Sequence, residues 1–266
     1  MFAPFKFIAR IVKVLVILIP NMSSSLTKEM RIATREIHKL SDALVNAKLA
    51  FALNNSEVWA DGLLVFYEVF KFLEENVPQD ILPVEYHRTQ QFENDLEFYK
   101  GNDWKNEYKI RESVQKYLSH LNEIQERNPR LLIAYVYHLY MGLLSGGQIL
   151  AKKRRIANKF MQKFNEQKDD TDEIAPGSHL TSFPNKSIFE LKNNFRQNID
   201  EVSSDFNENL RQALIDESHK VFELNNEIIK SVEGVEEQLK KNLRNFIGCL
   251  LLVIFSLYLF VKMWKV

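Results

Sequence analysis

Apolar residues recur along this 266-residue chain with the spacing of helices. From Val58 to Val77 and from Ser187 to Lys241 they return every three or four positions, whereas strands would show strict alternation. Glycine and proline, which interrupt helices, occur only 8 and 7 times. The long segment from Asn165 to Lys186 is polar, lacks this spacing and contains two prolines, which predicts a loop. The pattern therefore predicts an all-α protein with one sizeable domain.

Charge balance and cysteine content bear on three features: nucleic-acid binding, disulfides and cysteine-based metal sites. The 35 Lys and Arg residues balance the 35 Asp and Glu residues, so no overall positive field attracts nucleic acid, and we expect no nucleic-acid partner. Cys249 is the single cysteine, which excludes an intramolecular disulfide and a cysteine-based metal site. This cysteine usage suits a reducing compartment.

The C-terminal region, residues 238–266, is nearly unbroken apolar sequence from Phe246 to Val261 with basic flanks. As a helix this run would reach about 24 Å, less than the roughly 30 Å hydrocarbon core of a bilayer. A thin bilayer such as that of the endoplasmic reticulum, with Lys262 reaching to the interface, would close the gap. We therefore expect a C-terminal transmembrane helix that anchors the domain, and the alternative is a buried core helix.

Residues 1–21 form a basic hydrophobic N-terminal extension. Lys6, Arg10 and Lys13 leave only Val14 to Ile19 uninterrupted, which is too short for a span and weak for a signal peptide. A segment lying in a membrane interface is one interpretation. A start site placed too early is the other, because Met22 is followed by a conventional N-terminus. The main domain is then expected at residues 22–237.

Three glycines stand where a helix normally carries side chains, within the run from Leu139 to Gln148. Gly142 and Gly146 are four residues apart and share a helix face, and Gly147 beside them would widen the gap. Each costs about 1 kcal/mol against alanine in a helix interior, so the cluster needs a compensating cause. Something flat against the backbone is one cause, and close helix packing or a plain helix break are the alternatives.

This glycine run, read with its flanks, resembles the distal helix of the heme oxygenases, in which the glycines let the porphyrin approach the backbone. Leu26 to His38 is similar to the proximal helix of the same family. Further matches follow in the family's order, so the resemblance covers about residues 23–237; they lie at residues 83–88, 94–99, 181–185, 189–196 and 222–229. The resemblance implies a heme oxygenase-like all-helical domain that holds heme between a proximal and a distal helix.

The resemblance makes His38 the axial ligand of the heme iron. Asp42, one turn further along, takes the place of the family's longer glutamate as the acceptor that orients the imidazole. Spacing alone would leave His38 an ordinary helical histidine. We interpret the remaining histidines as structural or surface residues, with His138 the first exception because it lies in the glycine helix; they are His87, His120, His138, His179 and His219.

Two basic pairs match the family's contacts to the heme propionates. Arg31 and Arg35 lie one turn apart on the proximal helix, and Lys192 and Arg196 lie one turn apart on a later helix. Either pair alone would suit a solvated helix face. Two aromatic residues match the family's aromatic heme contacts and would equally suit a core: Tyr137 and Phe222.

Three positions depart from the family pattern. Leu143 stands where the family has a distal aspartate that holds a water against bound dioxygen, and Leu139 and Phe70 stand where it has an arginine and a tyrosine. Losing one member of a buried polar network leaves unsatisfied partners at about 1 to 3 kcal/mol each, whereas replacing all of them is nearly neutral. We expect a self-consistent apolar pocket with slow or regiochemically mixed oxygen chemistry.

The implied function is a heme oxygenase. Heme b would be both substrate and prosthetic group, opened by O2 to biliverdin, carbon monoxide and ferrous iron, with the backbone at Gly142 and Gly146 steering the oxygen. NADPH-cytochrome P450 reductase would supply electrons at the endoplasmic reticulum membrane, with the domain in the cytosol and biliverdin reductase as a further candidate partner. The run Lys152 to Arg155 would dock the reductase or simply be solvated. The alternative function is a heme sensor, buffer or carrier with little turnover.

Overall fold

The computed structural model describes residues 24–49, 55–162 and 175–264. In these ranges every regular element is a helix, which confirms the all-α prediction. The elements are, in order, α2 (Leu26–Ala33), α3 (Arg35–Leu49), α4 (Ser56–Asn76), η1 (Val84–Tyr86), α5 (Thr89–Lys100), α6 (Trp104–Glu107), α7 (Glu112–Arg127), η2 (Pro129–Leu131), α8 (Leu132–Gly142), η3 (Leu143–Gly147), α9 (Gln148–Gln162), α10 (Ile188–Val202), α11 (Glu208–Lys230) and α12 (Val235–Trp264).

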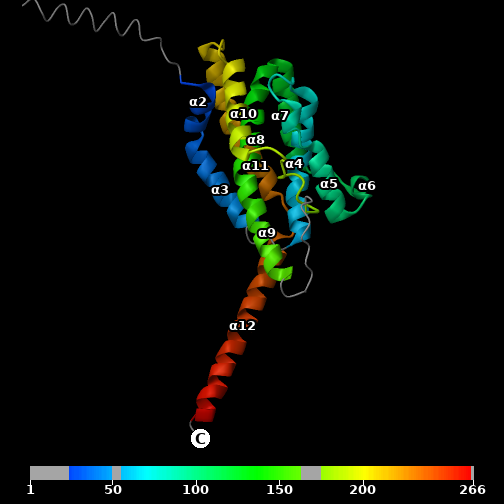
Figure 1. Ribbon diagram of the computed structural model, residues 1–266, viewed down its shortest axis with the longest axis vertical. Coiled ribbons are helices and arrows are strands. Elements are labelled where there is room, and N and C mark those ends of the chain that lie inside the picture. The colour runs from blue at the N-terminus through cyan, green and yellow to red at the C-terminus, as the bar shows by residue number, and fades with distance from the viewer. Residues whose placement is uncertain (1–23, 50–54, 163–174, 265–266) are drawn as a thin grey trace, which may run out of the picture.

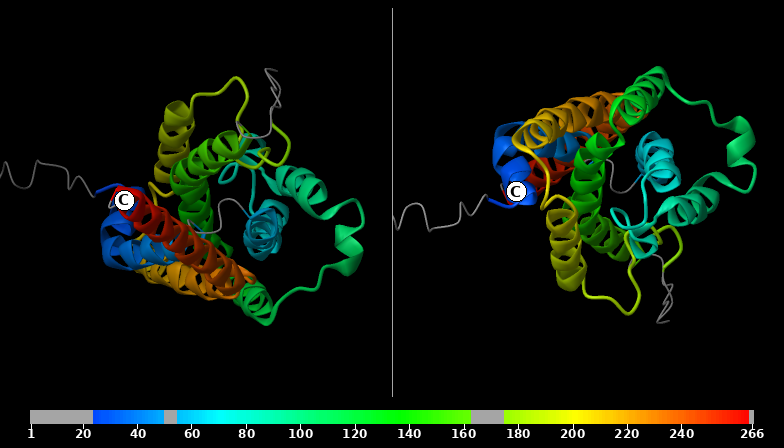
Figure 2. Two further views of the ribbon diagram at one scale, coloured as in Figure 1. Left: turned by 90° about the horizontal axis from the view of Figure 1, so that it is seen from below. Right: turned by 90° about the horizontal axis from the view of Figure 1, so that it is seen from above.

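Helices α8 and α11 run through the middle of the domain, with α2 and α3 on one side and α4, α5 and α7 on the other (Figures 1 and 2). The first five residues of α8, Leu132 to Val136, are each at most 1% exposed. A helix that is apolar all round is expected at the centre of a domain. Helix α11 contacts both α3 and α8, so α3 and α8 lie on either side of it.

The proximal segment bends between α2 and α3. The Thr34 hydroxyl donates a 2.8 Å hydrogen bond to the carbonyl of Met30, a local bond that often bends a helix. The chain then continues directly, because the amide of His38 donates to the carbonyl of Thr34 at 2.9 Å. The expected single proximal helix is thus two short helices, with Arg31 before the bend and Arg35 after it.

The glycine run is a π-helical turn, Leu143–Gly147, set between two α-helices. Such turns are rare and are often found at functional sites. A Cβ added at Gly142 or at Gly146 would have no atom within 4 Å, whereas one at Gly147 would lie 3.2 Å from Cδ1 of Leu143. Two of the three glycines therefore leave a bare surface, as expected. Gly147 does not widen it, because its missing side chain makes room for Leu143.

Helix α12 leaves the domain after Gly234 and projects away from it (Figure 1). Gly234 has φ of +76° and a Cβ there would lie 3.0 Å from Cγ2 of Val58, so this junction requires glycine. The apolar side chains of α12 are exposed, including Phe246 at 65% and Leu252 at 67%, which shows that the alternative of a buried core helix is wrong. Across the described ranges, no helix has the length and apolarity needed to cross a membrane.

Two other predictions fall partly outside the described ranges. The N-terminal extension at residues 1–21 lies outside them, and so do residues 165–174 of the expected loop. The described remainder of that loop, residues 175–186, consists of turns without a regular helix, as the sequence predicted.

Candidate cofactor-binding site

The imidazole of His38 on α3 has a polar partner at one of its two ring nitrogens. Its Nδ1 lies 3.0 Å from Oδ2 of Asp42, the acceptor expected one turn along, and its side chain is 54% exposed. Its Nε2 has no hydrogen bond to any described residue. A histidine whose Nδ1 is oriented by a carboxylate is typical of metal ligands, which bind through the other nitrogen. The ring also meets Phe222 of α11 edge-on, with the centroids 5.4 Å apart.

The segment α2–α3 runs alongside the segment α8–η3–α9, and the two touch at both ends. At one end the Tyr137 hydroxyl donates to the carbonyl of Thr27 at 3.2 Å. At the other end Nζ of Lys153 donates to Oδ1 of Asn46 at 3.5 Å. Both segments run in the same direction between these contacts. We call the exposed surface between them the cleft; it has His38 on one side and Gly142 and Gly146 on the other.

His38 and the bare glycines lie at the same level of this cleft. His38 follows Thr27 by 11 residues and Gly146 follows Tyr137 by nine, which corresponds to roughly 16 Å and 14 Å of helical rise. Gly142 and Gly146 are exposed and have open space where a side chain would be. The cleft thus has an imidazole on one side and bare backbone on the other, which suits a flat group that carries a metal.

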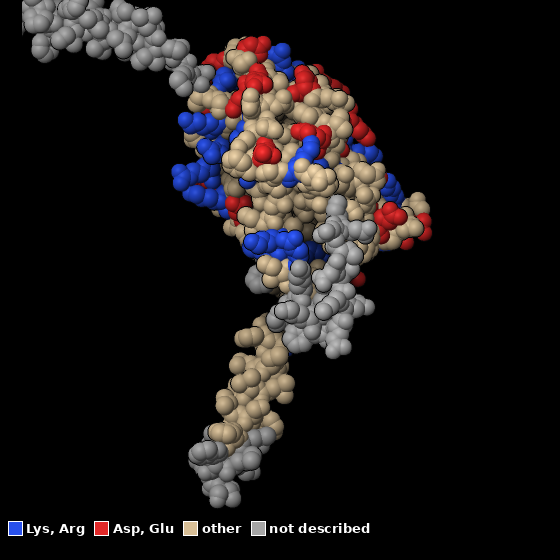
Figure 3. All heavy atoms as spheres, in the orientation of Figure 1, with Lys and Arg blue, Asp and Glu red and all other residues tan. Residues whose placement is uncertain are grey.

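The predicted cationic residues gather at the Tyr137 end of the cleft. Burial raises the pKa of the Tyr137 hydroxyl, while the charges of Arg196 and Arg31 lower it, so both guanidinium groups lie close to it. Arg196 also donates to the carbonyl of Lys192, one turn earlier on α10, at 3.4 Å. Arg35 is exposed and has no ion pair with any described residue. Figure 3 shows Lys and Arg side chains gathered along the α2–α3 edge.

A row of rings closes the inner side of the cleft. Tyr137 contacts His138 at 4.9 Å between centroids, His138 contacts Phe222 at 4.9 Å, and Phe222 contacts His38. Tyr137 and Phe222 are also 3% and 7% exposed. Their burial shows that both residues belong to the core, and their contact with heme stays a prediction.

The three apolar departures pack into the protein. Leu139 and Phe70 are 6% and 3% exposed, and Leu143 is partly buried against the core. The Phe70 ring contacts Tyr140 with the centroids 4.9 Å apart, and the Tyr140 hydroxyl donates to Glu74 at 2.8 Å. The Glu74 carboxylate is thus engaged by Tyr140.

Buried polar atoms without a partner mark the helix faces around the cleft. Among the described residues seven such side-chain atoms occur, and three lie one turn from a cleft residue. They are Oγ of Ser41 after His38, Nε2 of His138 before Gly142, and Oδ1 of Asn226 after Phe222. Each unsatisfied group costs about 1 to 3 kcal/mol, so each calls for an explanation, and a ligand bound in the cleft would supply one. Sequence reasoning missed Ser41 and Asn226, since neither residue type carries a signal without its surroundings.

His138 is the most unusual of the three. It lies on the partly buried side of α8, and neither ring nitrogen has a hydrogen bond to a described residue. Burial lowers its pKa below the usual range for histidine, and the charges of His38 and His219 lower it further. The imidazole is therefore neutral, with one donor and one acceptor nitrogen.

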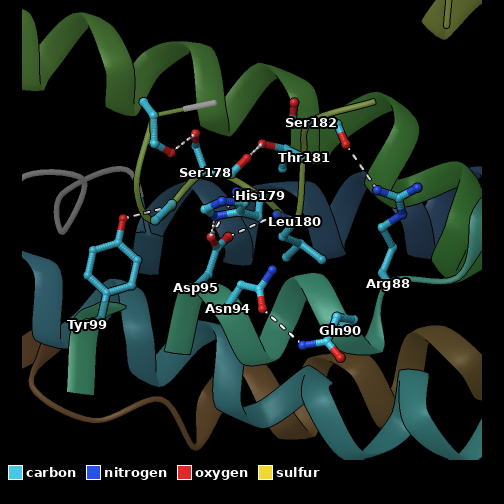
Figure 4. A network of polar contacts seen from close by, with 12 residues as sticks. Arg88, Gln90, Asn94, Asp95, Tyr99, Ser178, His179, Leu180, Thr181 and Ser182 are labelled. Carbon is cyan, nitrogen blue, oxygen red and sulfur yellow. Dashed lines mark hydrogen bonds and ion pairs between the residues drawn. The ribbon is translucent and has the colours of Figure 1, made fainter. Parts of the chain in front are cut away.

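A second polar cluster, shown in Figure 4, fixes the loop between α9 and α10. Both oxygens of buried Asp95 accept backbone amides, from His179 at 2.8 Å and Leu180 at 2.9 Å, and Nδ1 of His179 lies 2.9 Å from Oδ1. The adjoining cavity of about 290 Å³ is lined by Arg88, whose guanidinium donates to the carbonyls of Tyr86, Ser182 and Glu85. Because Asp95 and Arg88 are hydrogen-bonded to backbone groups, we interpret this cluster as structural: it holds the loop between α9 and α10 in place.

Comparison with known proteins identifies the domain. A family model described as heme oxygenase matches residues 24–231. The chain belongs to the heme oxygenase family. Heme oxygenase 1 of Homo sapiens is 28% identical over 212 residues, which cover 74% of this chain and 68% of the human protein. Heme oxygenase 1 of Gallus gallus is 31% identical over 153 residues, which cover 53% of this chain and only 50% of that relative.

Solved structures agree with the family and its fold. Heme oxygenase 2 of Chlamydomonas reinhardtii, solved without heme, is 27% identical with a TM-score of 0.66, covering 79% of this chain and 98% of that one. Heme oxygenase-2 of Synechocystis, solved with heme and NO, has a TM-score of 0.67 at 23% identity, covering 79% of this chain and 86% of that one, a likeness of fold alone. The heme oxygenase-like fold expected from the sequence is therefore confirmed.

Proposed function

We propose that the protein binds heme in the cleft between α3 and the glycine segment and opens its ring to biliverdin, carbon monoxide and ferrous iron. The observation that carries this proposal is the placement of His38. Its Nδ1 is engaged by Asp42, its ring is about half exposed, and it lies level with the bare backbone at Gly146. Family membership supports heme b as both substrate and prosthetic group.

The residues of the cleft fit heme in three respects. Gly142 and Gly146 have no atom within 4 Å of a would-be Cβ, which leaves a flat surface for a ring face. His38 offers the neutral imidazole nitrogen that heme iron binds. Arg31 and Arg196, with Lys192 beside them, place positive charge at one end, where two propionate carboxylates would be neutralised.

In this proposal, bound heme supplies the redox-active iron and the carbon that is oxidised, with O2 and NADPH-derived electrons as co-reactants. His38 fixes the group through Nε2, and Asp42 holds the proton on Nδ1. The bare backbone at Gly142 and Gly146 would lie against the ring and let it approach the helix closely. Tyr137 and Phe222 close the inner side and exclude water.

The electron donor and the location are part of the same proposal. The apolar side chains of α12 between Phe246 and Leu257 are exposed, and the described part of the projecting helix shows no charged colour in Figure 3. The run from Phe246 to Val261 contains no charged residue, which favours lipid over a protein partner at one face. We therefore place α12 in the endoplasmic reticulum membrane with the domain in the cytosol. NADPH-cytochrome P450 reductase would then be the electron donor, and biliverdin reductase a further candidate partner.

A heme sensor, buffer or carrier is the second candidate function. The observation that favours it is the apolar character of Leu139, Leu143 and Phe70, because none of these three positions supplies a carboxylate. A polar network that orders water would be expected to raise the rate and to select one ring position. Heme binding would be the same in both cases, so turnover separates them.

Single-turnover spectroscopy of the purified heme complex with reductase, NADPH and O2 is the test, with the products separated by chromatography. The enzyme proposal predicts biliverdin and carbon monoxide, formed slowly or as mixed isomers. His38→Ala, which removes the ligand, should abolish product formation, whereas His87→Ala outside the cleft should not. A complex that binds heme and yields no biliverdin would instead establish the sensor or carrier function.

A further inference from the structure

His138 lies on the same face of α8 as the bare glycines. It precedes Gly142 by four residues, which is one helical turn, and both belong to the regular helix Leu132–Gly142. Its ring touches Phe222, the residue that also touches His38, so it borders the cleft. Neither ring nitrogen has a hydrogen bond to a described residue, and Nε2 is shielded from solvent.

The other polar side chains of α8 are hydrogen-bonded, which sets His138 apart on this helix. The Tyr135 hydroxyl, three residues earlier, donates to Glu217 of α11 at 2.8 Å. The Tyr140 hydroxyl, two residues later, donates to Glu74 of α4. An imidazole left without a partner between two satisfied neighbours is unusual in a native core. It is explained if the partner enters the cleft from outside.

We propose that the His138 imidazole is the polar positioning residue of the distal side, hydrogen-bonding the water or small ligand that occupies the cleft beside the cofactor. This proposal rests on the proposed heme binding. Leu139 and Leu143 are apolar, and among the polar side chains of α8 and η3 His138 is the one with a buried atom that has no partner among the described residues, so the role falls to this imidazole. A neutral imidazole can donate or accept, which suits either ligand.

The experiment compares the heme complexes of the full chain and of His138→Leu, with His138→Gln as a conservative variant that keeps a donor. Two probes report on the polarity of the distal side: the C–O stretch of the ferrous carbon monoxide complex and the affinity of the ferric complex for cyanide. In His138→Leu the stretch should move to higher wavenumber and cyanide affinity should fall roughly tenfold, the fold change of one hydrogen bond. His138→Gln should restore much of both.

His120→Gln is the matched control, because this histidine contacts Glu217 and Tyr135 away from the glycine face. It should leave both probes unchanged. If His138→Leu folds poorly, the comparison of wild type with His138→Gln and His138→Phe gives the same decision. The melting temperature without heme should stay level or rise in His138→Leu, because an unpaired polar group is removed.

The outcomes separate this inference from the proposed function. A wild-type protein that fails to bind heme would overturn both. Heme binding with probes that are equal in wild type and His138→Leu would overturn the role of His138 and leave the proposed function standing. A ferric wild-type spectrum that is low-spin and becomes high-spin in His138→Leu would also contradict it, because His138 would then ligate the iron directly.

Discussion

Two polar sites on the same pair of helices differ in whether their groups are satisfied. Glu217 on α11 accepts hydrogen bonds from Tyr135 at 2.8 Å and Arg127 at 3.1 Å, and lies 2.9 Å from the ring of His120. One turn along α8, His138 has no such partner among the described residues. The first site is complete without a ligand and therefore stabilises the fold. At the second site His138 lacks a hydrogen-bond partner, as expected if a bound ligand supplies that partner.

The comparison extends to exposure. The Glu217 side chain is 11% exposed and sits among residues that hold it. The His38 side chain is 54% exposed, although it contacts the Phe222 ring and the Asp42 carboxylate. Changes at the Glu217 site should therefore affect stability and not heme binding. Changes at the His38 cleft should do the reverse.

The largest expected effect is on stability, from Glu217→Ala. Removal of the buried carboxylate leaves the Tyr135 hydroxyl and the charge of Arg127 without their partner, so the free energy of unfolding should fall by about 2 to 4 kcal/mol. Urea unfolding measures this. Glu223→Ala, which removes an exposed carboxylate paired with Lys220, is the control and should change stability by less than about 1 kcal/mol. An equal loss of unfolding free energy in Glu217→Ala and Glu223→Ala would contradict a special stabilising role for the Glu217 site.

The next effect is on heme affinity, from Gly146→Leu. No atom lies within 4 Å of a Cβ at Gly146, so the side chain should cost no stability in the protein without heme. It would nevertheless occupy the bare surface of the cleft, and heme affinity should fall at least tenfold, or about 1.4 kcal/mol. Heme titration followed by the Soret band measures the affinity. Gly248→Leu on α12 also has open space and should leave affinity unchanged; a matching loss there would refute a specific role for the glycine surface.

A smaller effect concerns acid stability. Burial raises the pKa of Glu217, but the hydrogen bonds from His120 and Tyr135 outweigh it, so the pKa of this carboxyl is lowered in the folded protein. Its stabilising contribution is therefore complete above the unfolded glutamate pKa of about 4.3 and is lost as the pH falls through the lower folded value. Glu217→Gln should flatten the acid limb of stability against pH. An unchanged slope below about pH 4.3 would show that Glu217 does not supply this linkage.

The smallest effect is expected from the basic pair on α10. Exposed or half-exposed ion pairs are worth about 0 to 1 kcal/mol, so Lys192→Ala with Arg196→Ala should change heme affinity only a few-fold. It should instead alter the ratio of the two heme orientations, measured by proton NMR of the complex. Lys220→Ala with Lys116→Ala removes charge elsewhere and should alter neither. Abolished binding with an unchanged orientation ratio would contradict this division of roles.

Much of the fold was predictable from the sequence because it depends on local patterns. The helical spacing from Val58 to Val77 became α4, Ser56–Asn76, and the pair of His38 and Asp42 formed because four residues make one turn. The bend at Thr34 and the π-turn after Gly142 were not predictable, since each depends on a local competition of hydrogen bonds. The unpartnered Oδ1 of Asn226 was not predictable either, because its burial depends on how the helices pack.

The most direct test of the central claim is the iron–histidine stretching band in the resonance Raman spectrum of the ferrous heme complex. If His38 is the ligand in a glycine-lined cleft, wild type and His219→Ala should both show the band. His38→Ala should lack it until imidazole is added. Persistence of the band in His38→Ala without imidazole would place the ligand elsewhere and contradict the account.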